Sequence, residues 1–177
     1  MQKKAEMENQ KKEDLAQLLD KTDNTSILNA IAILRDEGND QLLELVIQIY
    51  ISNSDREVRT AIFQLICDLK NQKSAEFVMA FINNPELASA KQMLVSSCWQ
   101  SRLNYIQYFE LFIQMVFVEP FEIAFEAFTV IENMEDRVSE SRKKELIHYI
   151  DSHLSECRIE NQVLADDLVS IIKQYEE

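Results

Sequence analysis

The chain has 177 residues, a formal net charge of −13 and a hydrophobic content of 46%, but only one glycine and two prolines. This length suits one domain with a substantial core. The scarcity of glycine excludes Rossmann and P-loop nucleotide sites, and the acidity argues against a nucleic-acid partner held by phosphate contacts. We therefore expect an all-helical protein that does not bind nucleic acid.

The first segment, residues 1–20, alternates Lys with Glu and Asp and predicts a polar N-terminal tail or capping helix, with a helix over 12–20. Its leucines at 15, 18 and 19 could cap the apolar end of the helices that begin after residue 24. The segment lacks the apolar run of a secretory signal, and the most apolar stretch, 105–118, is short and interrupted by polar residues. We therefore expect a cytoplasmic protein without a membrane partner.

From residue 24 onward, apolar residues recur at intervals of three and four, which is the helical period. Short polar breaks between them carry helix-start residues such as Asn, Ser and Asp, or Pro at a first turn. The expected helices, counted from this point, cover residues 25–36, 40–52, 55–70, 73–83, 85–100, 103–118, 120–134, 139–156 and 160–175.

Four of these helices share a spaced pattern of an apolar residue, a small alanine three positions on, and a large apolar residue four further. An alanine at a fixed place lets two helix backbones approach closely, as a stack of helix pairs requires. The four sets are Ile27/Ala30/Leu34, Val58/Ala61/Leu65, Leu87/Ala90/Leu94 and Ala124/Ala127/Ile131. Each is followed by a second apolar helix, with seams at Leu42/Leu43/Val46, Phe77/Val78/Phe81, Ile106/Phe109/Ile113 and Leu146/Ile147/Ile150.

The run from Asp55 to Leu65, DREVRTAIFQL, resembles the first-helix signature of the HEAT-repeat family, also described as an armadillo-like α-α superhelix. The resemblance covers about residues 24–156. It implies a right-handed α-α superhelix, or solenoid, of about four helix pairs with a C-terminal capping helix, within a repeat domain over residues 24–177. It also implies structural roles for Asp55 and Arg59. The other repeats lack the Arg, so a continuous ladder of Asp and Arg is not expected.

Residues with catalytic or metal-binding chemistry are sparse. His148 and His153 stand five apart, so they point in different directions on a helix and are read as solvated residues. Cys67, Cys98 and Cys157 are widely spaced and are read as free thiols in a reducing compartment. We therefore expect no enzyme activity, no metal and no cofactor.

Aromatic and acidic residues gather between residues 99 and 136. Phe109, Phe112, Phe121, Phe125 and Phe128 have core spacing and are expected to be buried. The candidate partner-binding residues are Trp99, Tyr105 and Tyr108, near a repeat's internal turn, and Glu119, Glu122 and Glu126, which are expected to share one helical face. Together they suggest one side of a groove for a basic or amphipathic helix.

The leading expectation is a non-catalytic adaptor that binds a partner protein or peptide, basic in character, on its concave or acidic face. Two alternatives are enzymes built on HEAT-like repeats, a DNA alkylpurine glycosylase and a chromophore lyase. The glycosylase would need a basic channel, which the net acidity disfavours. A third alternative is self-association into a homodimer through an uncapped apolar edge.

Overall fold

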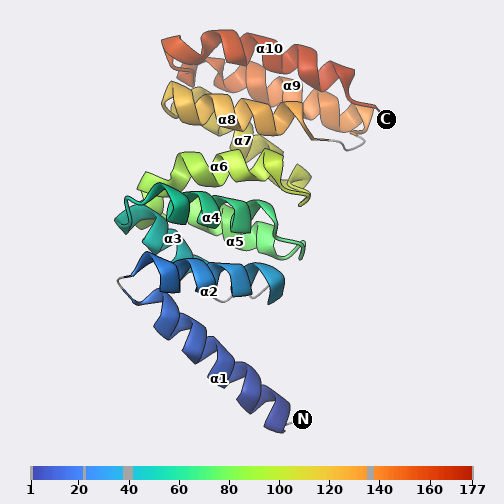
Figure 1. The fold of residues 1–177 in the computed structure, drawn as a ribbon. Helices are drawn as coiled ribbons and strands as arrows, with labels where there is room; N and C mark the ends of the chain where they lie inside the picture. The colour runs from blue at the N-terminus through green and yellow to red at the C-terminus, as the bar shows by residue number, and fades with distance from the viewer. Residues whose placement is uncertain (1, 22, 38–41, 135–137, 177) are drawn as a thin grey trace. The chain divides into compact units, whose positions relative to one another are not determined.

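The computed structural model describes residues 2–21, 23–37, 42–134 and 138–176, with side chains from residue 9 onward and residue 37 excepted. Over these ranges the chain is all-helical, with ten α-helices, short 3-10 helices and no strand (Figure 1). It forms two compact units: unit 1 comprises residues 1–97 and 101–103, and unit 2 comprises residues 98–100 and 104–177. The expected division into a 1–20 segment and a 24–177 repeat domain stays a prediction.

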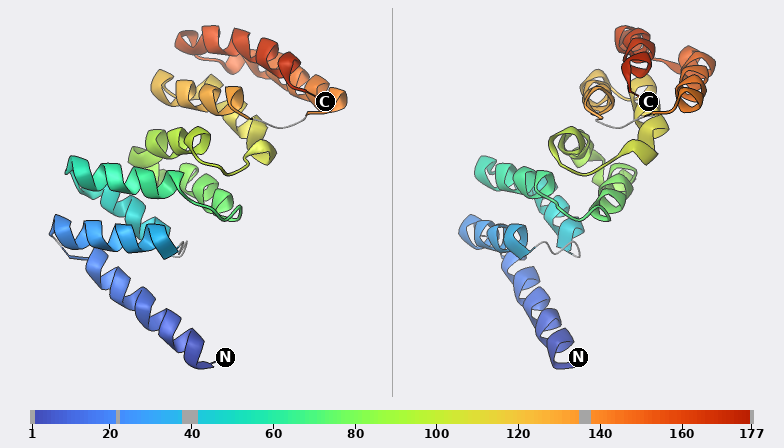
Figure 2. Two further views of the ribbon diagram at one scale, coloured as in Figure 1. Left: turned by 45° about the vertical axis from the view of Figure 1, so that its right-hand side comes forward. Right: turned by 90° about the vertical axis from the view of Figure 1, so that its right-hand side faces the viewer.

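Unit 1 is built from helices that pack on one another in two layers. Helix α1 packs on α2 and α3, α2 packs on α4, and α3 packs on α4 and on the 3-10 helix η2. Figure 2 shows α2 and α4 in one layer and α3 and α5 in the other. The elements are α1 (Gln2–Leu19), α2 (Asn24–Glu37), α3 (Leu43–Ser52), α4 (Arg56–Cys67), α5 (Ser74–Ile82), η2 (Pro85–Ala90) and most of α6 (Lys91–Gln100).

Helix α4 begins where the sequence predicts because Asp55 caps it. The Asp55 carboxylate accepts hydrogen bonds from the amides of Glu57 at 2.9 Å and Val58 at 3.1 Å, two of the donors that a helix start leaves unpaired. Arg59 lies with its guanidinium carbon 4.4 Å from the ring centroid of Tyr50. It therefore ties α4 to α3 through a cation–π contact.

Unit 2 is an arrangement of two helix pairs. Helix α7 packs on α8 and α9 packs on α10, while α10 also contacts α7 and α8. Within this unit α8 and α10 lie in one layer and α7 and α9 in the other (Figure 2). The elements are η3 (Ile106–Tyr108), α7 (Phe109–Val118), α8 (Phe121–Glu132), α9 (Glu140–His153), η4 (Leu154–Glu156), η5 (Ile159–Asn161) and α10 (Gln162–Gln174).

The spaced alanine pattern does mark the core. Ala30, Ala90 and Ala127 are completely buried, and Ala61 is half-buried. Every large apolar residue of the four sets is buried as well. The seams of the second helices are also buried or half-buried, except at Phe77, whose side chain is 46% exposed.

Two expected helices begin later than the apolar period suggests. The segment from Pro85 is a 3-10 helix up to Ala90, and the α-helix starts at Lys91. Before α7, the Asn104 carboxamide oxygen accepts a hydrogen bond from the Ile106 amide at 2.8 Å. This local turn delays the α-helix to Phe109, because an Asn side chain that binds the backbone competes with helical bonding.

Candidate functional site

The outward side of α8 carries two aromatic rings that were expected in the core. Phe121 and Phe125 are 45% and 49% exposed, and their rings stack at a centroid distance of 6.1 Å. The expectation was right for Phe109, Phe112 and Phe128, which are buried. Large exposed aromatic rings in contact with each other typically mark a binding surface on a folded protein.

The alanine register of α8 explains this correction. Ala124, Ala127 and Ile131 are all completely buried and so define the direction of the core. At 100° per residue, Phe121 points roughly 90° from that direction and Phe125 roughly 130°. A helical wheel centred on the alanines would have placed Phe125 in solvent. The spacing among the aromatic residues alone led to the wrong prediction that Phe121 and Phe125 are buried.

Trp99, in the last turn of α6, belongs to unit 2 and meets α8 through its polar edge. Its indole Nε1 donates a hydrogen bond of 2.8 Å to the Glu126 carboxylate, and its side chain is exposed. This bond restrains both side chains, and the Trp99 side chain stays 38% exposed. Trp99, Phe121, Glu122, Phe125 and Glu126 are hereafter called the α8 face.

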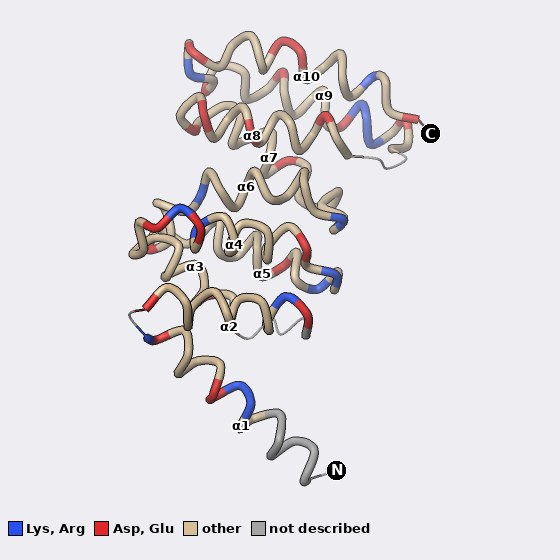
Figure 3. The backbone as a smooth tube through the Cα atoms, in the orientation of Figure 1, with Lys and Arg blue, Asp and Glu red and all other residues tan. Residues whose placement is uncertain are grey.

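The three glutamates of the predicted acidic face do not share one helix. Glu122 and Glu126 lie one turn apart on α8, but Glu119 caps the end of α7 with extended backbone angles. Pro120 follows Glu119 and disfavours the helical conformation there, so α8 begins only after it. Glu122 and Glu126 therefore remain one turn apart on α8, which carries acidic residues and no Lys or Arg over Phe121–Glu132 (Figure 3).

The two candidate tyrosines lie elsewhere in unit 2. Tyr105 is buried and packs edge-on against Phe112 at 6.2 Å between ring centroids. Tyr108 is half-buried, with its ring 6.4 Å from that of Tyr105. Because Tyr105 is buried, its side chain cannot contact a partner. It is part of the core and is no longer counted among the candidate binding residues.

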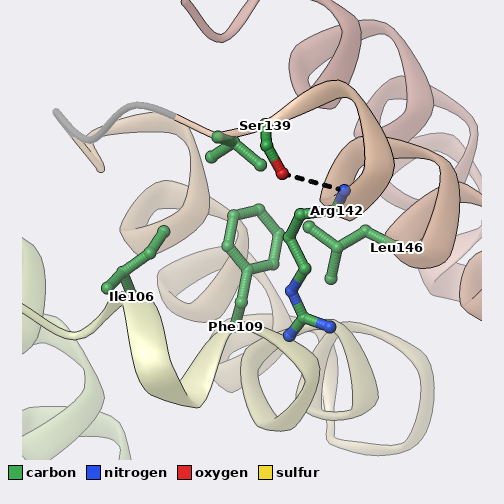
Figure 4. Close-up of a pocket in the computed structure, with 6 residues that line it drawn as sticks. Ile106, Phe109, Ser139, Arg142 and Leu146 are labelled. Atoms are coloured by element: carbon green, nitrogen blue, oxygen red, sulfur yellow. Dashed lines mark hydrogen bonds between the residues drawn. The ribbon is translucent and has the colours of Figure 1, made fainter. Parts of the chain in front are cut away.

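A separate pocket of about 270 Å³ opens between η3, α7 and the start of α9. Figure 4 shows the Phe109 ring at its centre, with Ile106 on one side and Leu146 on the other. Ser139 caps α9 by accepting a hydrogen bond from the Arg142 amide at 3.3 Å. The volume lies just below the range of about 300–1,000 Å³ that ligand pockets usually have.

The guanidinium of Arg142, which lines this pocket, is already paired with two carboxylates. Arg142 Nη1 lies 3.0 Å from a Glu110 oxygen and 3.2 Å from a Glu145 oxygen. Hydrogen bonding to Glu110 is the main cause that raises the pKa of Arg142 above its ordinary value. With two carboxylates on one guanidinium, the local charge disfavours an anionic ligand. The pocket is therefore interpreted as part of the contact between α7 and α9.

The cysteines and histidines are few in the part of the chain that the structure describes. No cluster of three or more His, Cys, Asp or Glu residues there is arranged to hold a metal ion. His148 is exposed, and the His153 ring stacks on Tyr149 with centroids 4.2 Å apart. Cys67, Cys98 and Cys157 are free thiols.

Comparison with family models and with curated proteins gives no match for this chain. Among the described residues, the structure has no helix with the length and apolarity needed to cross a membrane. The α8 face must therefore be interpreted from its own geometry.

Proposed function

We propose that this chain is a non-catalytic adaptor that binds a partner protein or peptide through the α8 face of unit 2. The observation that carries the proposal is the stacked, half-exposed pair Phe121 and Phe125, bordered by Glu122 and by the Trp99–Glu126 hydrogen bond. Aromatic anchors surrounded by polar groups are the usual composition of a protein-binding hot spot.

The finer architecture belongs to this proposal as well. The buried Ala30, Ala90 and Ala127, and the arrangement of helices in two layers within each unit, support a HEAT-like α-α superhelix closed by α10 as a capping helix. Helix α10 buries Leu164, Ala165 and Leu168 on one side and exposes Asp166 and Asp167 on the other, as a cap should. Three free cysteines support the cytoplasm as its location.

The proposal can be tested by affinity capture from a native cell extract. The tagged full chain is compared with a Phe121→Ser/Phe125→Ser variant and with Phe77→Ser, and retained proteins are quantified by mass spectrometry. Phe77 is the matched control because it is 46% exposed and lies in unit 1. Circular dichroism confirms that the three proteins are equally helical.

We expect at least one protein to be retained by the unaltered chain and by Phe77→Ser, and lost from the double variant. Removing two half-exposed aromatic anchors from a hot spot should reduce retention about tenfold or more. Equal retention by all three proteins would refute the α8 face as the binding surface.

A further inference from the structure

The exposed large apolar side chains of the described residues are concentrated in unit 2. All of them except Phe77 belong to this unit. Besides Phe121 and Phe125, the set includes Ile159 in η5, which is 86% exposed, and Val163 at the start of α10, which is 73% exposed. Exposed apolar side chains gathered within one small unit in this way are uncommon without a binding role.

Three hydrogen bonds hold the η5 turn against the turn between α7 and α8. The Arg158 amide donates to the Phe117 carbonyl at 2.9 Å, and the Arg158 guanidinium donates to the Val118 carbonyl at 3.4 Å. The buried Asn161 side chain donates to the Glu119 carbonyl at 2.8 Å. Residues 158–161 therefore lie alongside residues 117–119, immediately before α8.

This arrangement brings two exposed apolar sets to the same corner of unit 2. Val118 is itself exposed and precedes Phe121 by three positions, while Ile159 follows the clamped Arg158. The starts of α8 and α10 lie at the same end of their layer in Figure 1. The resulting α8–η5 strip consists of Val118, Phe121, Phe125, Ile159 and Val163.

Carboxylates border this strip, and basic residues are few. Glu122 and Glu126 stand on α8, and Asp166 and Asp167 stand exposed on α10. The Arg158 guanidinium beside the strip is paired with Glu160 at 2.9 Å. A partner is therefore complementary to this strip when it carries an apolar stripe flanked by positive charges.

The same charges disfavour other occupants. In a symmetric dimer formed through this strip, two surfaces that are both acidic would face each other and repel. Nucleic acid and anionic membranes carry the same sign of charge as this surface. A basic protein segment is the occupant that the surface fits.

We propose that the α8–η5 strip is the docking surface for a basic amphipathic helix of the partner protein. This inference rests on the proposed adaptor function and specifies the occupant and the extent of the site. The apolar face of such a helix, with residues at i, i+3 or i+4 and i+7, lies along the strip, and its Lys and Arg residues face Glu122, Glu126, Asp166 and Asp167.

The probe is a synthetic helix of about 18 residues, five turns, with Leu on one face, Lys on the flanks and no Trp. A peptide of identical composition with its Leu residues scattered is the control. Because Trp99 is the single tryptophan of the chain, its emission reports directly on the α8 face. Peptide anisotropy supplies the affinity at about 0.15 M salt, where nonspecific attraction is screened.

We expect the amphipathic helix to bind the full chain and to shift the Trp99 emission. The affinity of the scrambled peptide should be lower by about tenfold or more. Ile159→Ser/Val163→Ser should weaken binding about tenfold, because two aliphatic side chains would leave the interface. Phe77→Ser should bind like the unaltered chain.

A charge test separates the strip from general acidity. Glu122→Gln/Glu126→Gln removes two charges yet keeps an oxygen that can accept from the Trp99 indole. Glu13→Gln/Glu76→Gln removes two charges from exposed positions of unit 1. The first pair should weaken the amphipathic helix several-fold more than the second, because only the first pair borders the strip.

Equal binding of the two peptides, or unchanged binding to Ile159→Ser/Val163→Ser, would overturn this inference. A competition experiment with the captured natural partner distinguishes failure of this inference from failure of the proposed adaptor function. If the partner depends on Phe121 and Phe125 but the basic helix does not displace it, the adaptor function stands and the inference falls. If retention of the partner is unchanged in the Phe121→Ser/Phe125→Ser variant, both proposals are contradicted.

Discussion

Cys67 illustrates at the scale of one residue how the surroundings of a side chain change its chemistry. Burial raises the pKa of this thiol from 9.0 to about 11, Asp68 adds to the shift, and Arg35 opposes it. Because the folded state favours the neutral thiol, its contribution to stability is present below about pH 9 and is lost as pH rises towards 11. The thiolate, which is the reactive form, is correspondingly scarce at neutral pH.

We expect Cys67 in the native chain to be alkylated far more slowly than in the urea-unfolded chain at pH 8. A shift of two pKa units lowers the thiolate fraction about 100-fold. Iodoacetamide labelling, quantified for each cysteine peptide by mass spectrometry across pH 7–11, measures this. A native labelling midpoint near pH 9 would contradict the assignment.

At the scale of elements, capping and clamping residues decide where helices begin and which ones meet. Asp55 caps α4 within its own sequence neighbourhood, and this could be predicted because the capped amides lie two and three residues away. Asn161 acts across 42 residues by donating to the Glu119 carbonyl. No local pattern identifies such a clamp, because its partner is distant in sequence.

Asn161→Ala should lower the free energy of unfolding by about 1–3 kcal/mol, because a buried hydrogen bond between η5 and the α7–α8 turn is removed. Urea unfolding followed by circular dichroism measures the change. Gln162→Ala, at the neighbouring exposed position, is the control and should change stability by less than about 0.5 kcal/mol. Similar stabilities for the two variants would show that the clamp contributes little.

At the scale of the whole molecule, charge is the dominant long-range feature. The chain carries a formal net charge of −13, and α8 has three glutamates without a basic residue. Repulsion among like charges destabilises the folded state and is screened by salt. A net charge of this size also makes copies of the chain repel one another.

We therefore expect the melting temperature to rise between about 0.02 and 0.3 M NaCl, over which the screening length shortens severalfold. Each 1 kcal/mol of repulsion removed should raise it by about 2–4 °C in a chain of this size. The variant Glu122→Gln/Glu126→Gln/Glu132→Gln should melt higher at low salt and gain less from added salt. A melting temperature that falls with NaCl would show that attractive ion pairs dominate instead.

The helical class, the number of helices and most of their boundaries could be predicted from the amino-acid sequence, because short-range periodicity and capping set these features. The buried alanine register could be predicted in the same way, since residues three and four apart share a helix face. Among the candidate partner-binding residues, Trp99 and Glu126 are joined by a hydrogen bond, and Glu122 lies one helical turn from Glu126. Their role in binding a partner stays a prediction.

Tertiary packing decided which aromatic side chains are exposed and which are buried. Phe121 and Phe125 face solvent because the alanines turn the other side of α8 inward, while Tyr105 is buried against Phe112. Tertiary packing also brings Ile159 beside the start of α8, through hydrogen bonds between residues about 40 positions apart. Burial and long-range contact depend on which helices meet, and a one-dimensional period does not contain that information.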